Sequence, residues 1–148
     1  MIELPRPLPS AKDYLPDWST NRFVVFEPTN LWTPAISAEV HERLAVTDPQ
    51  TRATPVFEAC HAARDVIMLA EVRSTVGFVL FLTGLERECL GILGRLARLP
   101  RQRPILIVAE SAHRDLLPVL LEAGANAVLF DVKDDVSIAD WCLRFLAN

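Results

Sequence analysis

The chain has 148 residues, of which 51% are hydrophobic and 23% charged, with a formal net charge of −4 and a pI of about 5.3. This length suits one domain with a sizeable core, and the acidic balance gives no general attraction to nucleic acid or to anionic membranes. No apolar run approaches the roughly 18 to 20 residues that span a bilayer, and the first residues lack the apolar core of a signal peptide, so we expect a cytoplasmic protein.

Residues 1–21 are rich in proline, with Pro5, Pro7, Pro9 and Pro16 among the eleven prolines of the chain. Proline removes backbone hydrogen-bond donors and biases its neighbours to extended conformations, so an irregular arm is predicted. The arm could dock in an aromatic groove on a partner. Alternatively it could pack on its own domain through the apolar side chains Tyr14, Leu15 and Trp18.

After the arm, strand-like and helix-like segments alternate. The apolar run 22–27 (RFVVFE) predicts a buried strand, and Thr33 and Pro34 predict the N-cap and first turn of the helix that follows. A weaker strand is expected over 53–59. Pro55 has no backbone N–H to donate to a neighbouring strand, so this strand suits an edge of the sheet. A helix over 60–73 follows it.

The second half of the chain continues the alternation. Residues 76–83 (VGFVLFLT) are apolar on both faces, as in the centre of a parallel sheet, and a helix over 85–98 follows. Strands are predicted over 104–109 and 127–130. Between them we expect a helix that begins with Asp115 as N-cap, since Pro118 then lies in its first turn, and that ends at Gly124. A helix over 136–147 closes the chain.

Five consecutive β-α units favour a parallel sheet with helices on both faces, because crossover connections are right-handed. The predicted fold is therefore α/β, a flavodoxin-like (βα)5 three-layer sandwich with strand order 2-1-3-4-5. This order places the proline-bearing strand 53–59 at an edge and the most apolar strands in the middle. The expected organisation is an arm over 1–21 and one domain over 22–148.

The stretch from Arg103 to Lys133, RPILIVAESAHRDLLPVLLEAGANAVLFDVK, carries a family resemblance. Its order of strand, helix ending in Leu-Glu-Ala-Gly-Ala, strand and acidic turn resembles the last third of a bacterial response-regulator receiver domain. The resemblance extends in element order over about residues 22–147. It implies a switch site at the carboxyl ends of the strands, where open α/β sheets bind ligands.

The receiver family uses an acidic pair after the first strand, an Asp after the third, a Ser or Thr after the fourth and a Lys after the fifth. The matching residues here are Glu27, Thr83, Ala109 and Asp131, which we expect to form a degenerate receiver pocket. Ser111 and Lys133 each fall two residues beyond the expected position. Phosphoryl transfer needs an acceptor carboxylate and charge compensation together, so ordinary aspartyl phosphorylation is not expected. The resemblance thus implies a pseudo-receiver.

The leading functional hypothesis is a non-catalytic, phosphorylation-independent pseudo-receiver that acts as a regulatory or scaffolding protein-interaction module. The alternative is a small-molecule or divalent-metal sensor at the edge that bears Glu27, Thr83, Glu110 and Asp131, since converging carboxylates suit hard cations. A small enzyme at the same edge is a weaker third option, because no nucleophile is paired with a base. No cofactor motif and no zinc or redox cysteine motif is present, so Cys60, Cys89 and Cys142 are expected to be buried thiols.

The closing helix has more apolar residues than one stripe requires. Val136, Ala139, Leu143 and Leu146 form a line, with Trp141 near by. Such a surplus suggests a partner surface or a homodimer through the last two helices, as the receiver resemblance also implies. The alternative is that the arm covers this line with Leu15 and Trp18.

A second candidate surface lies between the third helix and the fourth strand. It contains four arginines without an intervening acid: Arg95, Arg98, Arg101 and Arg103. They form either a solvated loop or an anion patch for a phosphate-bearing or acidic partner. Because no aromatic residues are interleaved with them, binding to nucleic acid is not expected.

Overall fold

The computed structural model describes residues 21–47 and 54–146 and contains one five-stranded parallel sheet. The predicted strand order is confirmed as β2-β1-β3-β4-β5. The strands are β1 Arg22–Phe26, β2 Val56–Cys60, β3 Thr75–Phe81, β4 Ile105–Ala109 and β5 Ala127–Phe130. The helices are α2 Trp32–Thr47, α3 Ala63–Ala70, α4 Glu86–Leu96, the 3-10 turn η1 Ser111–Leu116, α5 Leu117–Glu122 and α6 Val136–Leu146. The predicted arm 1–21 lies outside the described residues except for Asn21.

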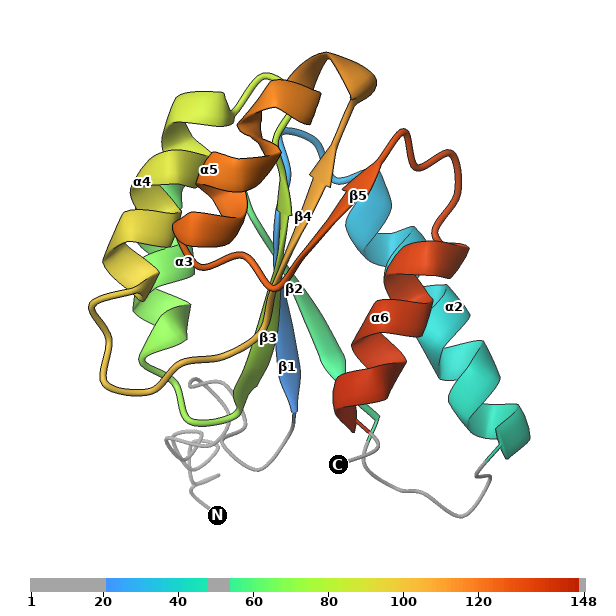
Figure 1. Cartoon of the computed structure of the whole chain (residues 1–148). Coiled ribbons are helices and arrows are strands. Elements are labelled where there is room, and N and C mark those ends of the chain that lie inside the picture. Colours follow the sequence, from blue (N-terminus) through green and yellow to red (C-terminus); the bar gives the residue numbers. More distant parts are fainter. Residues whose placement is uncertain (1–20, 48–53, 147–148) are drawn as a thin grey trace, which may run out of the picture.

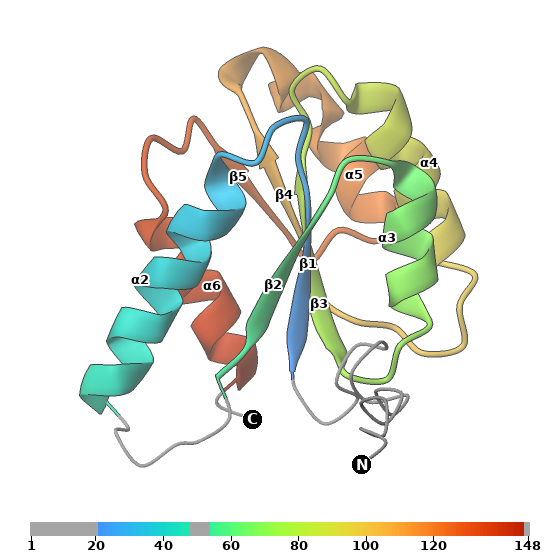
Figure 2. The same ribbon diagram turned by 180° about the vertical axis from the view of Figure 1, so that it is seen from behind.

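Helices cover both faces of the sheet, so the molecule has three layers (Figure 1). Helices α2 and α6 lie on one face, and α3, α4 and α5 lie on the other; the reverse view in Figure 2 shows the same division. Each face has its own apolar cluster because side chains alternate along a strand. In β1, for example, Phe23 and Val25 point towards α2 and α6, whereas Val24 and Phe26 point to the opposite cluster.

The burial of the strands follows their position in the sheet. Every residue of β1 and β4 is buried, while the edge strands β2 and β5 are mostly half-buried. The prediction of an edge strand next to Pro55 is confirmed, with the strand starting at Val56. The Pro55 carbonyl accepts a hydrogen bond from His41 Nε2 at 2.8 Å, which ties the approach to this edge onto α2.

The helix between β4 and β5 begins differently from the prediction, and Asp115 is not its N-cap. The 3-10 turn η1 starts directly after β4 at Ser111, and α5 begins at Leu117 with Pro118 in its first turn. The local reason is that Ser111 and His113 find polar partners at the strand end, which fixes the turn early. Pro118 keeps its predicted place because a first-turn residue needs no N–H donor. Gly124, with φ of 122°, follows the helix as predicted.

Helix α6 packs against α2, and this changes the role predicted for its apolar surplus (Figure 2). Ala139 is 0% and Trp141 6% exposed. The Trp141 ring lies 6.4 Å from the Phe23 ring and 4.8 Å from the Phe145 ring. The predicted interaction surface is therefore wrong for Ala139 and Trp141, because α6 buries apolar side chains both on the sheet and on α2.

The remaining three residues of that predicted surface differ in accessibility. Leu143 and Leu146 are half-buried at the α2-facing cluster, and Val136 is 40% exposed at the start of the helix. Only Val136 is thus openly available for a contact. The alternative that residues 1–20 cover this line lies outside the described residues.

Candidate functional site

A cleft of about 550 Å³ lies over the carboxyl ends of the strands. Its lining comes from the segments that follow β1, β3, β4 and β5, which is the edge where open α/β sheets bind ligands. The lining residues are Pro28, Thr29, Trp32, Phe81, Thr83, Val108, Ala109, Glu110, Ser111, Ala112, Asp131, Val132 and Lys133. Of the residues assigned to the predicted receiver pocket, Thr83, Ala109 and Asp131 line this cleft and Glu27 does not.

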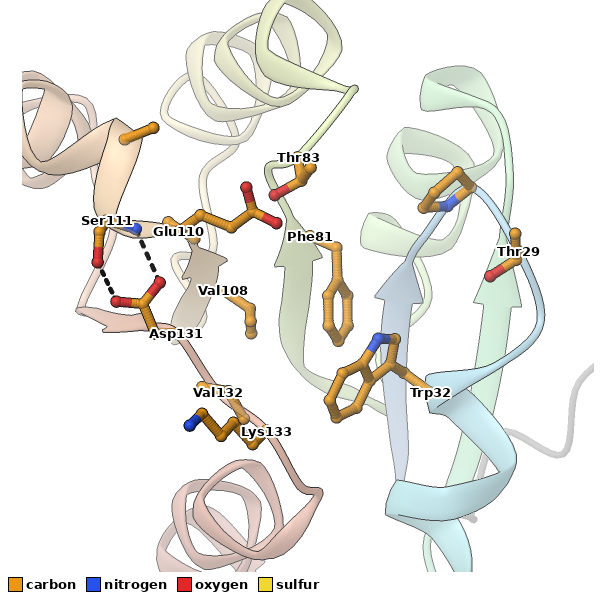
Figure 3. Close-up of a pocket in the computed structure, with 13 residues that line it drawn as sticks. Thr29, Trp32, Phe81, Thr83, Val108, Glu110, Ser111, Asp131, Val132 and Lys133 are labelled. Carbon is orange, nitrogen blue, oxygen red and sulfur yellow. Dashed lines mark hydrogen bonds between the residues drawn. The ribbon is translucent and has the colours of Figure 1, made fainter.

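One wall of the cleft is aromatic. The rings of Trp32 and Phe81 stack at 5.3 Å with an interplanar angle of 29°. Figure 3 shows this pair across the cleft from Ser111 and Asp131, with Val108 between the two sides. The cleft therefore combines an apolar wall with a polar rim.

Glu27 is fully buried and points to the start of α2 instead of into the cleft. Its two carboxylate oxygens accept the backbone N–H groups of Leu31, Trp32 and Thr33 at 2.7 to 2.9 Å. The Thr33 hydroxyl donates to the same carboxylate. The prediction that Thr33 itself caps the helix is thus wrong, because Glu27 satisfies the free N–H groups of the first turn and places a negative charge at the positive end of the helix dipole.

The sequence does indicate which way Glu27 points, although matching it to the receiver pattern overlooked this. Glu27 has the same parity as Phe23 and Val25, the two β1 residues that face α2 and α6. Side chains two apart on a strand point to the same face, so Glu27 continues that row. The acid matched to the receiver metal pair is consequently a structural cap.

The end of β3 supplies no carboxylate to the cleft. Phe81 and Leu82 are buried at 7% and 0% exposure, and Thr83 is exposed on the rim. Whichever of these three residues occupies the acceptor place, it cannot form an acyl phosphate. The nearest acid in sequence, Glu86, lies in the first turn of α4.

Ser111 and Asp131 form a latch between the segment after β4 and the segment after β5. The Ser111 N–H donates to Asp131 Oδ1 at 2.9 Å, and the Ser111 hydroxyl donates to Asp131 Oδ2 (Figure 3). These bonds, first that from the hydroxyl, hold the pKa of Asp131 below its usual value, with Arg114 and Lys133 adding to the effect. Asp131 has φ of 54°, a conformation that Asp tolerates better than most residues.

Ser111 lies two residues beyond the position where the receiver resemblance implies a Ser or Thr, yet it still reaches the strand end. The 3-10 turn η1 brings Ser111 next to Asp131, while the Asp131 N–H donates to the Ala109 carbonyl at 2.9 Å. The carboxylate at the place of the receiver lysine is therefore paired with a hydroxyl and an amide, both of which lie on the neighbouring loop. Lys133 lies on the rim of the same cleft.

His113 connects the loops after β3 and β4. Its Nδ1 accepts the Glu110 N–H at 3.1 Å, so Nε2 carries the proton that is donated to Glu86 Oε1 at 3.2 Å. Glu86 also accepts the Gly84 N–H at 3.2 Å, and backbone hydrogen bonds followed by His113 lower its pKa. The His113 side chain is only 12% exposed, so the link is shielded from solvent on the histidine side.

Only some of the acids expected to converge at this edge do so. Glu110 and Asp131 reach the cleft, while Glu27 is used by α2. Within residues 21–47 and 54–146, no three His, Cys, Asp or Glu side chains gather in a way that could hold a metal ion. In the same ranges, no helix is both long enough and apolar enough to cross a bilayer.

The four arginines of the predicted anion patch do not act as one group. Arg95 and Arg98 are exposed along and just after α4. Arg101 and Arg103 reach across to backbone carbonyls at the end of α3. All four lie at the end of the molecule opposite the cleft, as expected from their place before β4.

No family model and no curated protein sequence matches the chain. Solved structures do match its fold. A response regulator signal receiver domain from Bermanella marisrubri shares 18% identity with a TM-score of 0.60, covering 86% of this chain and 99% of that one. The chemotaxis response regulator CheY4 of Vibrio cholerae shares 9% identity with a TM-score of 0.62, over 86% and 99% of the two chains.

A putative pilus assembly protein, CpaE, from Burkholderia thailandensis is also similar in structure. It shares 14% identity with a TM-score of 0.63, over 87% of this chain and all of that one. Identities this low establish the fold alone. Element order, sheet topology and these neighbours together show that the chain has the α/β flavodoxin-like fold of response-regulator receiver domains.

Proposed function

We propose that this chain is a non-catalytic pseudo-receiver: a regulatory or scaffolding module that binds proteins without a phosphorylation step. The Ser111–Asp131 latch is the observation that carries the proposal. It puts a carboxylate, held by Ser111, at the position where the receiver resemblance implies a lysine. The latch links the two loops by hydrogen bonds within the chain itself, so their arrangement needs no added phosphate.

The charges in the cleft support this proposal. A phosphoryl group brought to the end of β3 would meet Phe81, Leu82 and Thr83, none of which offers a carboxylate. On the rim it would face Glu110 and Asp131, whose like charges oppose a phosphate dianion. The acceptor carboxylate is thus missing, and an acid replaces the compensating lysine at position 131, although Lys133 lies on the same rim. Phosphoryl transfer depends on the acceptor and on charge compensation together.

The direct test is incubation with acetyl phosphate and Mg²⁺, followed by intact-mass measurement. We expect no mass increase, because no acyl phosphate can form. A stable adduct of one phosphoryl group that persists in Thr83→Val and is absent from a heat-denatured sample would refute the proposal. A bona fide receiver treated in the same tube supplies the positive control.

We further propose that the protein contact uses the face formed by α5, β5 and α6. The exposed apolar side chains on the two helices are Val119, Leu121 and Val136, at 48%, 46% and 40% exposure. Strand β5 lies between these helices in Figure 1 and pairs only with β4 within the described sheet. This retains the last two helices as the contact region but replaces the buried Ala139 and Trp141 with residues that a partner can reach.

Self-association is the first form of contact to test. Light scattering of the full chain over a range of concentrations should show a dimer that Leu121→Glu and Val136→Glu dissociate. Met68→Glu is the matched control, since Met68 is 62% exposed on α3, which packs near β1 and β2, at the other edge of the sheet from β5. A monomer at every concentration would rule out the homodimer without touching the phosphorylation result.

A small-molecule sensor remains the second candidate, and the cleft itself favours it. Its volume of about 550 Å³ lies within the range of ligand pockets, and the Trp32–Phe81 wall suits a flat apolar group. A divalent-metal sensor has less support, because Glu27 is engaged by α2. Calorimetric titration with Mg²⁺ and Ca²⁺ and a ligand screen by intrinsic tryptophan fluorescence would test this candidate. Heat of binding abolished by Glu110→Gln would favour it.

A further inference from the structure

A second pocket lies at the end of the sheet opposite the cleft. It has a volume of about 320 Å³ and lies between the end of α3 and the segment that joins α4 to β4. We call it the arginine pocket because its lining contains Arg73, Arg101 and Arg103, together with Ala70, Glu71, Leu99 and Pro100. Arg73 belongs to the segment after α3 and was not part of the predicted patch.

Two guanidinium groups of the pocket are held in place by the backbone. Arg101 Nη1 donates to the Arg73 carbonyl at 2.8 Å. Arg103 Nη2 donates to the Val72 carbonyl at 3.2 Å, and its Nη1 donates to the Ala70 carbonyl. These bonds satisfy carbonyls at the end of α3 and fix the cations before any ligand arrives.

The positive charge of the pocket is not balanced within residues 21–47 and 54–146. There, no carboxylate forms an ion pair with Arg73, Arg101 or Arg103, although Glu71 is part of the lining. Arg103 Nε is buried without a hydrogen-bond partner among those residues. Burial, and then repulsion from Arg101, lower the pKa of Arg103. A carboxylate entering the pocket would offset the repulsion between the guanidinium groups of Arg101 and Arg103.

The N-terminal arm joins the domain beside this pocket. The Arg22 N–H donates to the Ser74 carbonyl at 2.8 Å, and Ser74 follows Arg73 directly. Asp17 stands four residues before Asn21, a span of up to about 14 Å when extended. Residues 13–20, DYLPDWST, contain two acids and no Lys or Arg, together with Tyr14, Leu15 and Trp18.

We propose that the arm segment 13–18 docks in the arginine pocket, with the Asp17 carboxylate against Arg73 and Arg101. The apolar side chains of the segment then contact Leu99 and Pro100. The acidic and apolar side chains of the segment complement the arginines and the apolar residues of the pocket. The short span between Asp17 and Asn21 keeps the segment near the pocket. The docked arm leaves the cleft and the α5–β5–α6 face accessible, and it sets aside the alternative in which Leu15 and Trp18 cover α6.

The chain permits a selective test, since its only lysines are Lys12 and Lys133. A lysine-specific protease that cuts after Lys12 requires the adjoining segment to leave the pocket. Arg73→Gln combined with Arg101→Gln should accelerate this cut about fivefold, the effect expected for the loss of a modest ion-pair contribution when cleavage follows the open population. Arg95→Gln combined with Arg98→Gln is the matched control, with the same charge change outside the pocket.

Asp17→Asn tests the contact from the other side and alters none of the described residues. It should accelerate the cut similarly, and its combination with the two pocket substitutions should be no faster than either alone, because all remove one shared contact. The proposal is overturned if the pocket variants match the wild type or if the control pair accelerates the cut equally. It is also overturned if protection of Lys12 disappears on dilution, since the arm would then dock on a second copy.

Discussion

Replacement of Glu27 by Gln is the sharpest test of the site described above. Glu27 is 0% exposed, and four donors share its two carboxylate oxygens. A Gln side chain keeps one acceptor oxygen but turns an NH₂ group towards the remaining donors. The Thr33 N–H or the pair from Leu31 and Trp32 then loses its acceptor, and the start of α2 loses a compensating negative charge.

The magnitude follows from these losses. A hydrogen bond to a charged group contributes about 1.5 to 3 kcal/mol, and a partly buried charge at a helix end adds up to about 2 kcal/mol. We therefore expect Glu27→Gln to lower the free energy of unfolding by roughly 3 kcal/mol. For a chain of this size the melting temperature should fall by roughly 6 to 12 °C.

Thermal and urea unfolding followed by circular dichroism would measure this change. Glu110→Gln is the control, because it makes the same chemical change at an exposed residue of the cleft and should stay within about 0.5 kcal/mol. If Glu27 instead served as one of several mutually repelling cleft acids, its neutralisation would raise stability. An unchanged or raised melting temperature for Glu27→Gln would therefore refute the capping role.

Three further outcomes are expected. The pKa of Asp131 is lowered, so its latch to Ser111 stabilises the fold above the ordinary Asp pKa of about 3.9 and loses this effect as pH falls through the lower folded value. Melting curves of wild type and Asp131→Asn should thus differ at neutral pH and converge in strong acid; a constant gap would contradict the latch. Trp141→Ala should cost about 3 to 5 kcal/mol in urea unfolding, as for a core residue, whereas a Trp on a partner surface would cost little in the monomer. Burial raises the pKa of all three cysteine thiols to about 12, so a thiol reagent at mild alkaline pH should label none in the native protein and three after denaturation; rapid native labelling would show that burial is incomplete for Cys60, Cys89 and Cys142.

The candidate site was only partly predictable. Thr83, Ala109 and Asp131 lie together in the cleft, as the sequence indicated, because parallel strands bring the residues that follow them to one edge of the sheet. The bond between Ser111 and Asp131 was not predicted, since it depends on a 3-10 turn whose start is fixed by its partners. The Arg73 contribution to the arginine pocket was missed for a similar reason, because α3 and the segment before β4 meet only in three dimensions.

For the described residues, the sequence alone determined the order of the five strands and of the α-helices between them, although not the 3-10 turn η1. Alternation of apolar residues, turn residues and the apolar runs over β1 and β3 are local features, and a right-handed connection between parallel strands leaves few topologies. These features also determined that no acceptor carboxylate follows β3. The solved structures that resemble this chain agree with the predicted fold.

Only the tertiary structure decided which partner each ambiguous side chain meets. Glu27 at a strand end could turn to the cleft or to the next helix, and the unsatisfied N–H groups of α2 decided in favour of the helix. Trp141 could face a partner or the core, and the neighbouring α2, about a hundred residues earlier in the chain, decided in favour of the core. Both outcomes depend on long-range neighbours, whose positions a periodic pattern within one segment does not contain.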